Sequence, residues 1–341
     1  MFSRIAKVLG ASIVASGTLG GVALAASGPP PPPTAANGAT VEQVAANLGT
    51  PTSFAFGAGS VFEGDGGSNM AGPPNGGVFV LKRGTATKLA GSPNFVGGLA
   101  WRKGTLYVSS GTVGASGNKF QILAWSGWNG TAFTKKKAIY TAPKKFDGFN
   151  GLAFGPDGRL YVGVDGGLTN NNDHGPANTP YLYDILSMNI NGKGLKVFAT
   201  GIRQPWQMVF PGRSSAPFVS DLGQDTGAKN PPDFLLRVHR GDNFGFPACN
   251  WVKKSACKGY AKPVKFFRPH TNVMGLAIIG ERLFMSEFGG RAPGKVVSMP
   301  LAGGKVTPAV TGFVAPVVGL AARGHWLYIG EVTGQVFRVK Q

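Results

Sequence analysis

The chain has few charged residues, and acidic residues are especially scarce. Of its 341 residues, 15 are Asp or Glu and 34 are Lys or Arg, which gives a net charge of +19. Charged residues make up only 14% of the chain, and beyond position 50 few stretches of fifteen residues lack both Gly and Pro. Together these deficits exclude long, periodic helices. The 43% of apolar residues can still build a core, so the composition indicates strands and turns.

Long apolar runs are missing except at the N-terminus. Arg4 and Lys7 precede an uncharged run over residues 8–26 that contains a small-x-small sequence, Ala-Leu-Ala, near its end. This pattern predicts a secretory signal peptide over residues 1–25, with a membrane anchor as the alternative. Residues 26–39 read as an unpacked, Pro-rich linker. We therefore expect a secreted, periplasmic or cell-envelope protein whose mature chain has no transmembrane segment.

Cysteine is nearly missing as well. Cys249 and Cys257 are the only two, and both lie in one predicted loop. In an exported protein such a close pair favours a disulfide. A zinc site would need two further ligands, and that loop contains no His.

What the chain does have is a phrase that recurs six times. A short apolar strand, a turn and a strand of the Leu-Tyr-Val type occupy residues 53–65, 98–110, 151–165, 207–221, 275–287 and 319–331. A third strand follows each pair, and a weaker fourth follows several. Repeats of this length and content predict an all-β, six-bladed β-propeller of four-stranded antiparallel blades over residues 40–341. A pair of β-sandwiches is the alternative, but it gives no reason for the recurrence.

The last repeat ends without a fourth strand, because the chain stops at Gln341. Residues 40–48 belong to no repeat and can supply the missing strand. We therefore predict that an N-terminal strand closes the ring, which removes two exposed sheet edges.

In a propeller, the first strands begin and the second strands end at one end of the central channel, here called the mouth. Acidic residues follow five of the six second strands: Glu63, Asp65, Asp165, Asp221, Glu287 and Glu331. Residues with polar or aromatic side chains precede the first strands: Asn94, Asn150, Arg203, Gln204, Trp206 and His270. So many acids at one place predict a site compensated by calcium or arginine. The alternative is that each acid caps a nearby turn.

Four segments of the chain resemble the soluble quinoprotein glucose/sorbosone dehydrogenase family. They are GLAFGPDGRLYVGVDGG from residue 151, YLYDILSMNINGKG from 181, VFATGIRQPWQMVF from 197 and DFLLRVHRGDNFGFPACNW from 233. Their order and spacing agree with the family pattern over about residues 98–251. The resemblance implies a six-bladed propeller with pyrroloquinoline quinone (PQQ) over the channel and calcium beside it. It also implies oxidation of a sugar or sugar-like alcohol by hydride transfer to the quinone.

Several residues match the family roles by position. Arg203 matches the arginine that holds a cofactor carboxylate or quinone oxygen, and Asp233 matches an acid of the family motif. The other implied cofactor residues are Gln204, which stands where the family has Asn, together with Trp206 and Asn150. The calcium segment corresponds to Gly223, Gln224 and Asp225.

The family's general base is missing from its expected place. Residues 147–150 read Asp-Gly-Phe-Asn, with no histidine. His270, just ahead of a first strand, is the expected substitute, and His174 is a weaker one. This departure keeps a second class open, a non-catalytic envelope propeller that binds carbohydrate or another ligand.

A third hypothesis is a metal-dependent, lactonase-type hydrolase that uses Glu63, Asn150 and Asp221. The lysine clusters lie in predicted loops of an exported chain, so we expect no nucleic-acid partner. They favour a solvated surface or contact with an anionic cell-wall surface.

Overall fold

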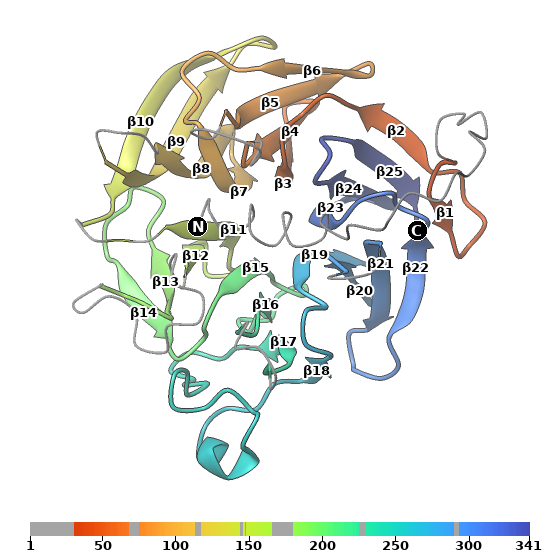
Figure 1. Cartoon of the computed structure of the whole chain (residues 1–341). Coiled ribbons are helices and arrows are strands. Elements are labelled where there is room, and N and C mark those ends of the chain that lie inside the picture. The colour runs from red at the N-terminus through yellow and green to blue at the C-terminus, as the bar shows by residue number, and fades with distance from the viewer. Residues whose placement is uncertain are drawn as a thin grey trace, which may run out of the picture.

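The computed structural model describes residues 31–67, 75–112, 117–143, 146, 148–165, 180–224, 230–289 and 293–341. Its β-strands form six sheets arranged as blades around a central axis, so the predicted six-bladed propeller is confirmed (Figure 1). One short 3-10 helix, η1 (Lys254–Cys257), is the only helix in these ranges. None of the described helical structure is long or apolar enough to cross a membrane.

The first three blades each use four consecutive strands, ordered from the axis outward. Blade one contains β3 (Pro51–Gly57), β4 (Ser60–Asp65), β5 (Gly77–Lys82) and β6 (Thr85–Lys88). Blade two contains β7 (Phe95–Arg102), β8 (Thr105–Thr112), β9 (Lys119–Trp128) and β10 (Phe133–Thr141). Blade three contains β11 (Phe149–Phe154), β12 (Leu160–Val164), β13 (Ile185–Met188) and β14 (Lys196–Ala199).

The other three blades include the two strands from the N-terminal region. Blade four contains β15 (Pro205–Val209), β16 (Phe218–Asp221), β17 (Asp233–Arg237) and β18 (Lys265–Phe267). Blade five contains β19 (Val273–Ile279), β20 (Arg282–Glu287), β21 (Lys295–Pro300) and β22 (Thr307–Thr311), with β1 (Thr34–Ala35) added outside. Blade six contains β23 (Val317–Arg323), β24 (Trp326–Glu331), β25 (Val336–Lys340) and β2 (Glu42–Ala45).

The ring closes through its N-terminal strand, as the sequence predicts. β2 pairs antiparallel with β25, so the first blade-forming residues complete the last blade. Arg338 reinforces this pairing, because its guanidinium donates to the Glu42 carboxylate at 2.8 and 2.6 Å. The expectation of an unpacked linker is wrong for Thr34 and Ala35, which pair with β22. Ala35 is buried against blade five because its methyl group joins the apolar cluster between blades five and six.

The core consists of apolar layers between neighbouring blades. Each layer joins one blade to the next, including a layer between blades six and one that contains Phe54 and Tyr328. The second strands share one register: an aromatic residue such as Phe62 faces the following blade, and the next residue along the strand faces the preceding one. The recurring sequence phrase therefore supplies the residues that pack between neighbouring blades.

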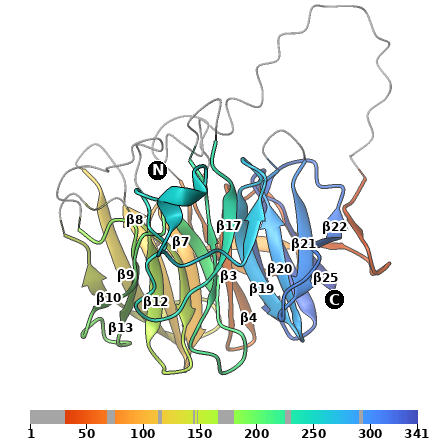
Figure 2. The same ribbon diagram turned by 90° about the horizontal axis from the view of Figure 1, so that it is seen from below.

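Most of these phrases begin with a glycine, and no other residue fits there because the innermost strands of neighbouring blades approach each other closely. A Cβ atom on Gly275 would lie 2.6 Å from the carbonyl oxygen of Val318, and one on Gly319 would lie 2.6 Å from that of Pro51. Such distances are too short for any side chain. The blades can therefore crowd around a narrow axis. Seen from the side, the strands of the blades run roughly along this axis (Figure 2).

Candidate functional site at the mouth of blade four

Three of the six acids at the mouth, Asp65, Asp221 and Glu331, accept hydrogen bonds from the backbone that enters a first strand. Asp65 accepts hydrogen bonds from the backbone N–H groups of Gly49, Thr50 and Gly67 at 2.8, 3.1 and 2.6 Å. Glu331 accepts one from the N–H of Ala315 at 2.7 Å. For these residues the capping alternative is what the structure shows, and the prediction of one shared, cation-compensated acid cluster is wrong for them.

Glu63 is an exception, because both of its carboxylate oxygens are buried and accept no hydrogen bond from any described residue. Burial, with a smaller contribution from Asp65, raises the pKa of Glu63 well above its usual value. The register aligns Glu63 with apolar residues of the other blades, all of them also fully buried: Val108, Val162, Val219, Met285 and Ile329. Glu63 therefore lies in the apolar layer between blades six and one.

This position argues against the lactonase set. Glu63 faces blade six, whereas Asp221 belongs to blade four and accepts a hydrogen bond from the backbone N–H of Gln204 at 2.7 Å. Among the described residues, no group of three His, Cys, Asp or Glu side chains could hold a metal ion. The placement of Glu63 between blades six and one therefore does not support a metal centre made of Glu63, Asn150 and Asp221.

Arg203 is the central side chain of the mouth at blade four. It lies just ahead of β15 and is only 4% exposed. Its Nη1 atom donates to the carbonyl oxygens of Leu222 and Gly223 at 2.7 and 2.8 Å, and to Gln204 Oε1 at 3.2 Å. The guanidinium therefore ties the entry to β15 to the turn that follows β16.

Asp233 begins β17 and joins Arg203 to the loop before β19. Its carboxylate accepts a bond from the Gly223 N–H at 2.7 Å and another from the Asn272 N–H at 2.7 Å. Burial raises the pKa of Asp233 to about 6, although His270 and Arg203 act in the opposite direction. Burial likewise raises the pKa of Asp221 to about 7, against the effects of the Gln204 N–H and the Arg203 charge. The mouth of blade four thus carries two buried carboxyl groups whose pKa values are raised above the usual value, mainly by burial.

His270 lies beside this cluster, as the sequence predicts from its place ahead of a first strand. The side chain is exposed, and its Nε2 atom is in hydrogen-bond contact with the Asn230 amide nitrogen. A contact from an amide nitrogen, which is a donor, to Nε2 fits an imidazole that carries its proton on Nδ1. The other histidine candidate, His174, lies outside the described residues.

Asn150 and Trp206 extend the site toward the axis. The Asn150 amide nitrogen donates to the Pro205 carbonyl oxygen at 3.0 Å, whereas its Oδ1 atom is buried and accepts no hydrogen bond from a described residue. Trp206 belongs to an apolar cluster that also contains Phe95, Leu222, Met274, Phe288 and Val318. These residues come from four blades and from the mouth ends of their strands, so they meet at the axis.

The oxygens predicted to bind calcium already have partners. The Gly223 carbonyl accepts from Arg203 at 2.8 Å, and Gln224 Oε1 accepts from the Asn250 amide at 3.0 Å. A guanidinium at one of these oxygens disfavours a second cation there. Asp225 lies outside the described residues. The described part of the predicted calcium segment therefore does not fit a calcium ion.

The disulfide loop borders the same site. Cys249 and Cys257 are bonded, with their Cα atoms 4.9 Å apart, so this prediction is confirmed. Cys249, Asn250 and Trp251 line a cavity together with Arg203 and Gln224. Its volume of about 20 Å³ admits a water molecule and no sugar. The cavity is thus part of the support of the site.

Two further residues were not identified from the sequence. One contributes its backbone N–H group, and the other occupies in blade three the place that Asp233 has in blade four. Asn272 serves Asp233 through its backbone N–H, which no side-chain pattern reveals. Asp184 directly precedes β13, as Asp233 begins β17, and burial raises its pKa to about 6. Alignment of the third strands of blades three and four could have identified it.

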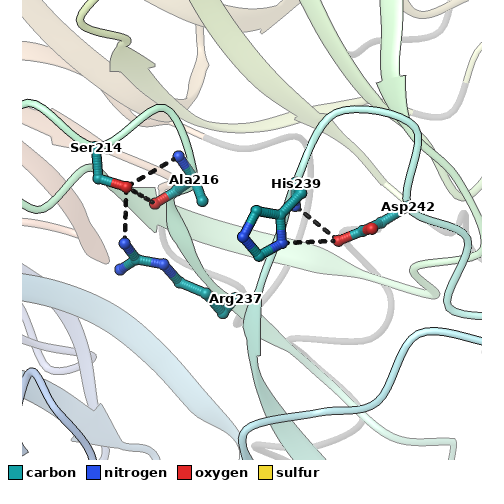
Figure 3. A network of polar contacts seen from close by, with 5 residues as sticks. All are labelled: Ser214, Ala216, Arg237, His239 and Asp242. Carbon is teal, nitrogen blue, oxygen red and sulfur yellow. Dashed lines mark hydrogen bonds and ion pairs between the residues drawn. The ribbon is translucent and has the colours of Figure 1, made fainter.

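A second polar network lies at the far end of β17 and is separate from the mouth. Arg237, the last residue of β17, donates to the Ser214 hydroxyl at 2.8 Å, and His239 Nδ1 lies 3.4 Å from the Asp242 carboxylate (Figure 3). His239 therefore follows the end of the strand opposite to Asp233, which leaves His270 as the histidine described beside the mouth cluster.

No family model matches the chain, and no curated protein matches it. Solved structures do match over most of its length. One is an oxidoreductase from Thermus thermophilus described as a glucose dehydrogenase, with a TM-score of 0.71, 18% identity, and coverage of 89% of this chain and 100% of that one. Another is the PQQ-bound form of an aldose sugar dehydrogenase from Streptomyces coelicolor, with a TM-score of 0.66, 18% identity, and coverage of 90% and 99%.

A protein described as a gluconolactonase also matches, with a TM-score of 0.58, 15% identity, and coverage of 91% of this chain and 97% of that one. These likenesses show a shared fold. The resemblance to quinoprotein sugar dehydrogenases, drawn from four segments of sequence, is thus confirmed at the level of the fold.

Proposed function

We propose that this propeller is an exported, PQQ-dependent sugar dehydrogenase whose active site is the mouth at blade four. The observation that carries the proposal is the cluster of Arg203, Asp233 and His270, which the fold brings together from three separate segments. The fold shared with a PQQ-bound aldose sugar dehydrogenase supports it. When bound, the quinone would accept a hydride from an alcohol carbon of the sugar.

The polar residues at this mouth suit an anionic cofactor. The central apolar cluster contains Trp206 and Phe95, which are only 4% and 0% exposed, so a flat ring system would have to displace their neighbours to stack on them. At its edge, the Arg203 guanidinium can hold a carboxylate or adjacent quinone oxygens through parallel N–H bonds. Gln204 and Asn150 would complete the polar edge, since Asn150 Oδ1 accepts no bond from a described residue. Calcium remains a prediction of the resemblance alone.

His270 would take the proton from the sugar hydroxyl. Its Nε2 atom accepts from the Asn230 amide, so a substrate hydroxyl that displaced this amide would meet a neutral imidazole acceptor. Asp233 stabilises the imidazolium that results, because its carboxylate is close enough to interact with His270 electrostatically. The family's usual base is missing from residues 147–150, so His270 takes this role in the proposal.

Export remains part of the proposal. The signal peptide predicted over residues 1–25 lies outside the described residues, whereas the Cys249–Cys257 disulfide supports an oxidising compartment. The predicted sugar substrate rests on the dehydrogenase likeness.

Reconstitution tests this function. PQQ, with and without calcium, is added to the purified chain, and cofactor absorbance, binding affinity and dye reduction with a panel of aldoses are measured. Arg203→Lys keeps the charge and loses the planar fork, so we expect quinone affinity to fall about tenfold. Arg159→Lys is a matched control, because Arg159 also donates to two backbone carbonyls, those of Ser187 and Gly194, away from the mouth.

The outcomes separate the hypotheses. Weaker quinone binding in Arg203→Lys but not in Arg159→Lys, at equal melting temperature, supports the site. Quinone that binds without being reduced by any sugar supports the non-catalytic binding propeller. If Arg203→Lys binds the quinone as tightly as the parent chain, the assignment fails at its best-matched residue.

A further inference from the structure

The region around the disulfide loop has no acidic residue. Between Asp242 and Glu281 the chain contains no Asp or Glu, while it contains five lysines and one arginine. Five of these cations are exposed: Lys253, Lys254, Lys258, Lys262 and Arg268. None of the five forms an ion pair with another residue in the described ranges. Positive charge is therefore concentrated there without local compensation.

The same region exposes apolar side chains, which are otherwise few on this protein. Val252, Val264 and Phe266 are 46%, 47% and 39% exposed, and they make up half of the large apolar residues found exposed in the described chain. Val252 directly precedes Lys253, and the Trp251 ring packs edge-on against Phe266 at 5.3 Å. The loop therefore contacts β18 through Trp251 and Phe266, and the three exposed apolar residues and five exposed cations of this segment are here called the basic loop surface.

The loop projects from the ring and is held in shape. Figure 1 shows η1 at the end of an extension beyond β18, outside the circle of blades. The disulfide closes this loop, and both Cys249 and Cys257, the last residue of η1, are buried. Because the disulfide already restricts the conformations of the loop, the loop would lose little conformational entropy when it binds a partner. The extension can also reach a flat surface that the ring itself does not touch.

We propose that the basic loop surface docks the protein onto an anionic phospholipid bilayer. Lysines attract anionic headgroups, and exposed apolar side chains between them enter the boundary with the acyl chains. A cell-wall polyanion would match the lysines, but it offers no apolar phase for Val252 and Val264. An acidic protein partner would require a broader face than one narrow projection. This inference is independent of the proposed catalytic function.

Vesicle binding tests the proposal. The protein purified from the exported fraction is sedimented with vesicles of phosphatidylcholine alone and of phosphatidylcholine with 30% phosphatidylglycerol. We expect binding to the anionic vesicles only. The triple variant K253Q/K254Q/K258Q should bind them at least tenfold more weakly, since each lysine contributes roughly fivefold near such a surface. The control K119Q/K135Q/K137Q removes the same charge from exposed positions in blade two and should change binding little.

The variant V252S/V264S separates a bilayer from a polyanion. It should lower affinity for anionic vesicles about fivefold and leave binding to soluble polyphosphate unchanged. Three results overturn the proposal. One is no binding to anionic vesicles, which points to a protein partner; another is an equal loss in the two lysine variants, which means that net charge alone acts. The third is unchanged vesicle binding by V252S/V264S, which points to a polyanion. Equal melting temperatures for all variants ensure that folding is not the cause.

Discussion

Replacing Glu63 with methionine should stabilise the protein, because Glu63 occupies a position that is apolar in every other blade. The change restores an unbranched side chain of similar length to the layer between blades six and one. A buried polar group without a partner costs about 1 to 3 kcal/mol. With both oxygens of Glu63 lacking a described partner, we expect a gain of about 2 kcal/mol at pH 7. For a chain of this size, that is a rise in Tm of roughly 3 °C.

The gain should depend on pH in a defined direction. The folded-state pKa of Glu63 is raised above the unfolded value of about 4.5. The native state therefore binds a proton more tightly than the unfolded state, and the resulting stability is fully present below pH 4.5. It is lost as pH rises from there toward the folded-state pKa. The stabilisation by Glu63→Met, measured by chemical and thermal unfolding, should thus be larger at pH 8 than at pH 4.

Two controls make this test specific. Glu63→Gln keeps a polar group but cannot ionise, so its stability relative to methionine should not vary with pH. Met285→Glu places an acid at the equivalent position of blade five and should destabilise the protein more at pH 8 than at pH 4. A Glu63→Met variant less stable than the parent, or a gain equal at both pH values, would refute the reasoning. It would show that the Glu63 carboxylate is ionised and has a partner.

Three further outcomes are expected. Replacing Cys249 and Cys257 with serine should lower stability by about 2 to 3 kcal/mol in non-reducing unfolding experiments, because the bond closes a short loop in the unfolded chain; equal stability of variant and parent would contradict this. Deleting residues 26–33 should leave the Tm unchanged, whereas deleting 26–45 removes β1 and β2 and should lower it sharply; an unchanged Tm for the longer deletion would disprove closure by β2. Asp233→Asn removes a carboxyl with a folded pKa of about 6, so the loss of stability that the parent shows as pH rises from about 4 to 6 should be smaller in this variant. Parallel pH profiles by calorimetry would count against that assignment.

The fold was open to sequence reasoning because one physical constraint recurs six times. Each blade packs its innermost strand against the next, with an aromatic residue at a fixed place in all six second strands and a glycine at the start of four of the six phrases. The repetition predicts strand number, order and the closing role of β2. It does not predict β1, because Thr34 and Ala35 carry no periodic signal and are ordered only by the edge of β22.

The site was less open to prediction, because sequence position does not fix side-chain partners. Arg203, Asp233 and His270 were found by their place at the mouth and by resemblance. The role of Asp65 could not be predicted, because the sequence does not show whether an acid that follows a strand binds a cation or backbone N–H groups. Only the position of Gly49 and Thr50 decides between them. Glu63 belongs to the same acidic pattern, and the strand register alone separates it from the others.

The pairing of β2 with β25 and of β1 with β22 has a consequence for the order of events during synthesis. Residues 34–45 leave the ribosome before any blade exists, yet their partners include residues 336–338, near the end of the chain. Blade one can form early, but its face toward blade six stays uncovered until β24 and β25 have been synthesised. A chain interrupted before residue 336 would expose that face, with Phe54 and Glu63 on it. The ring can therefore close only after the last strand, β25, has emerged.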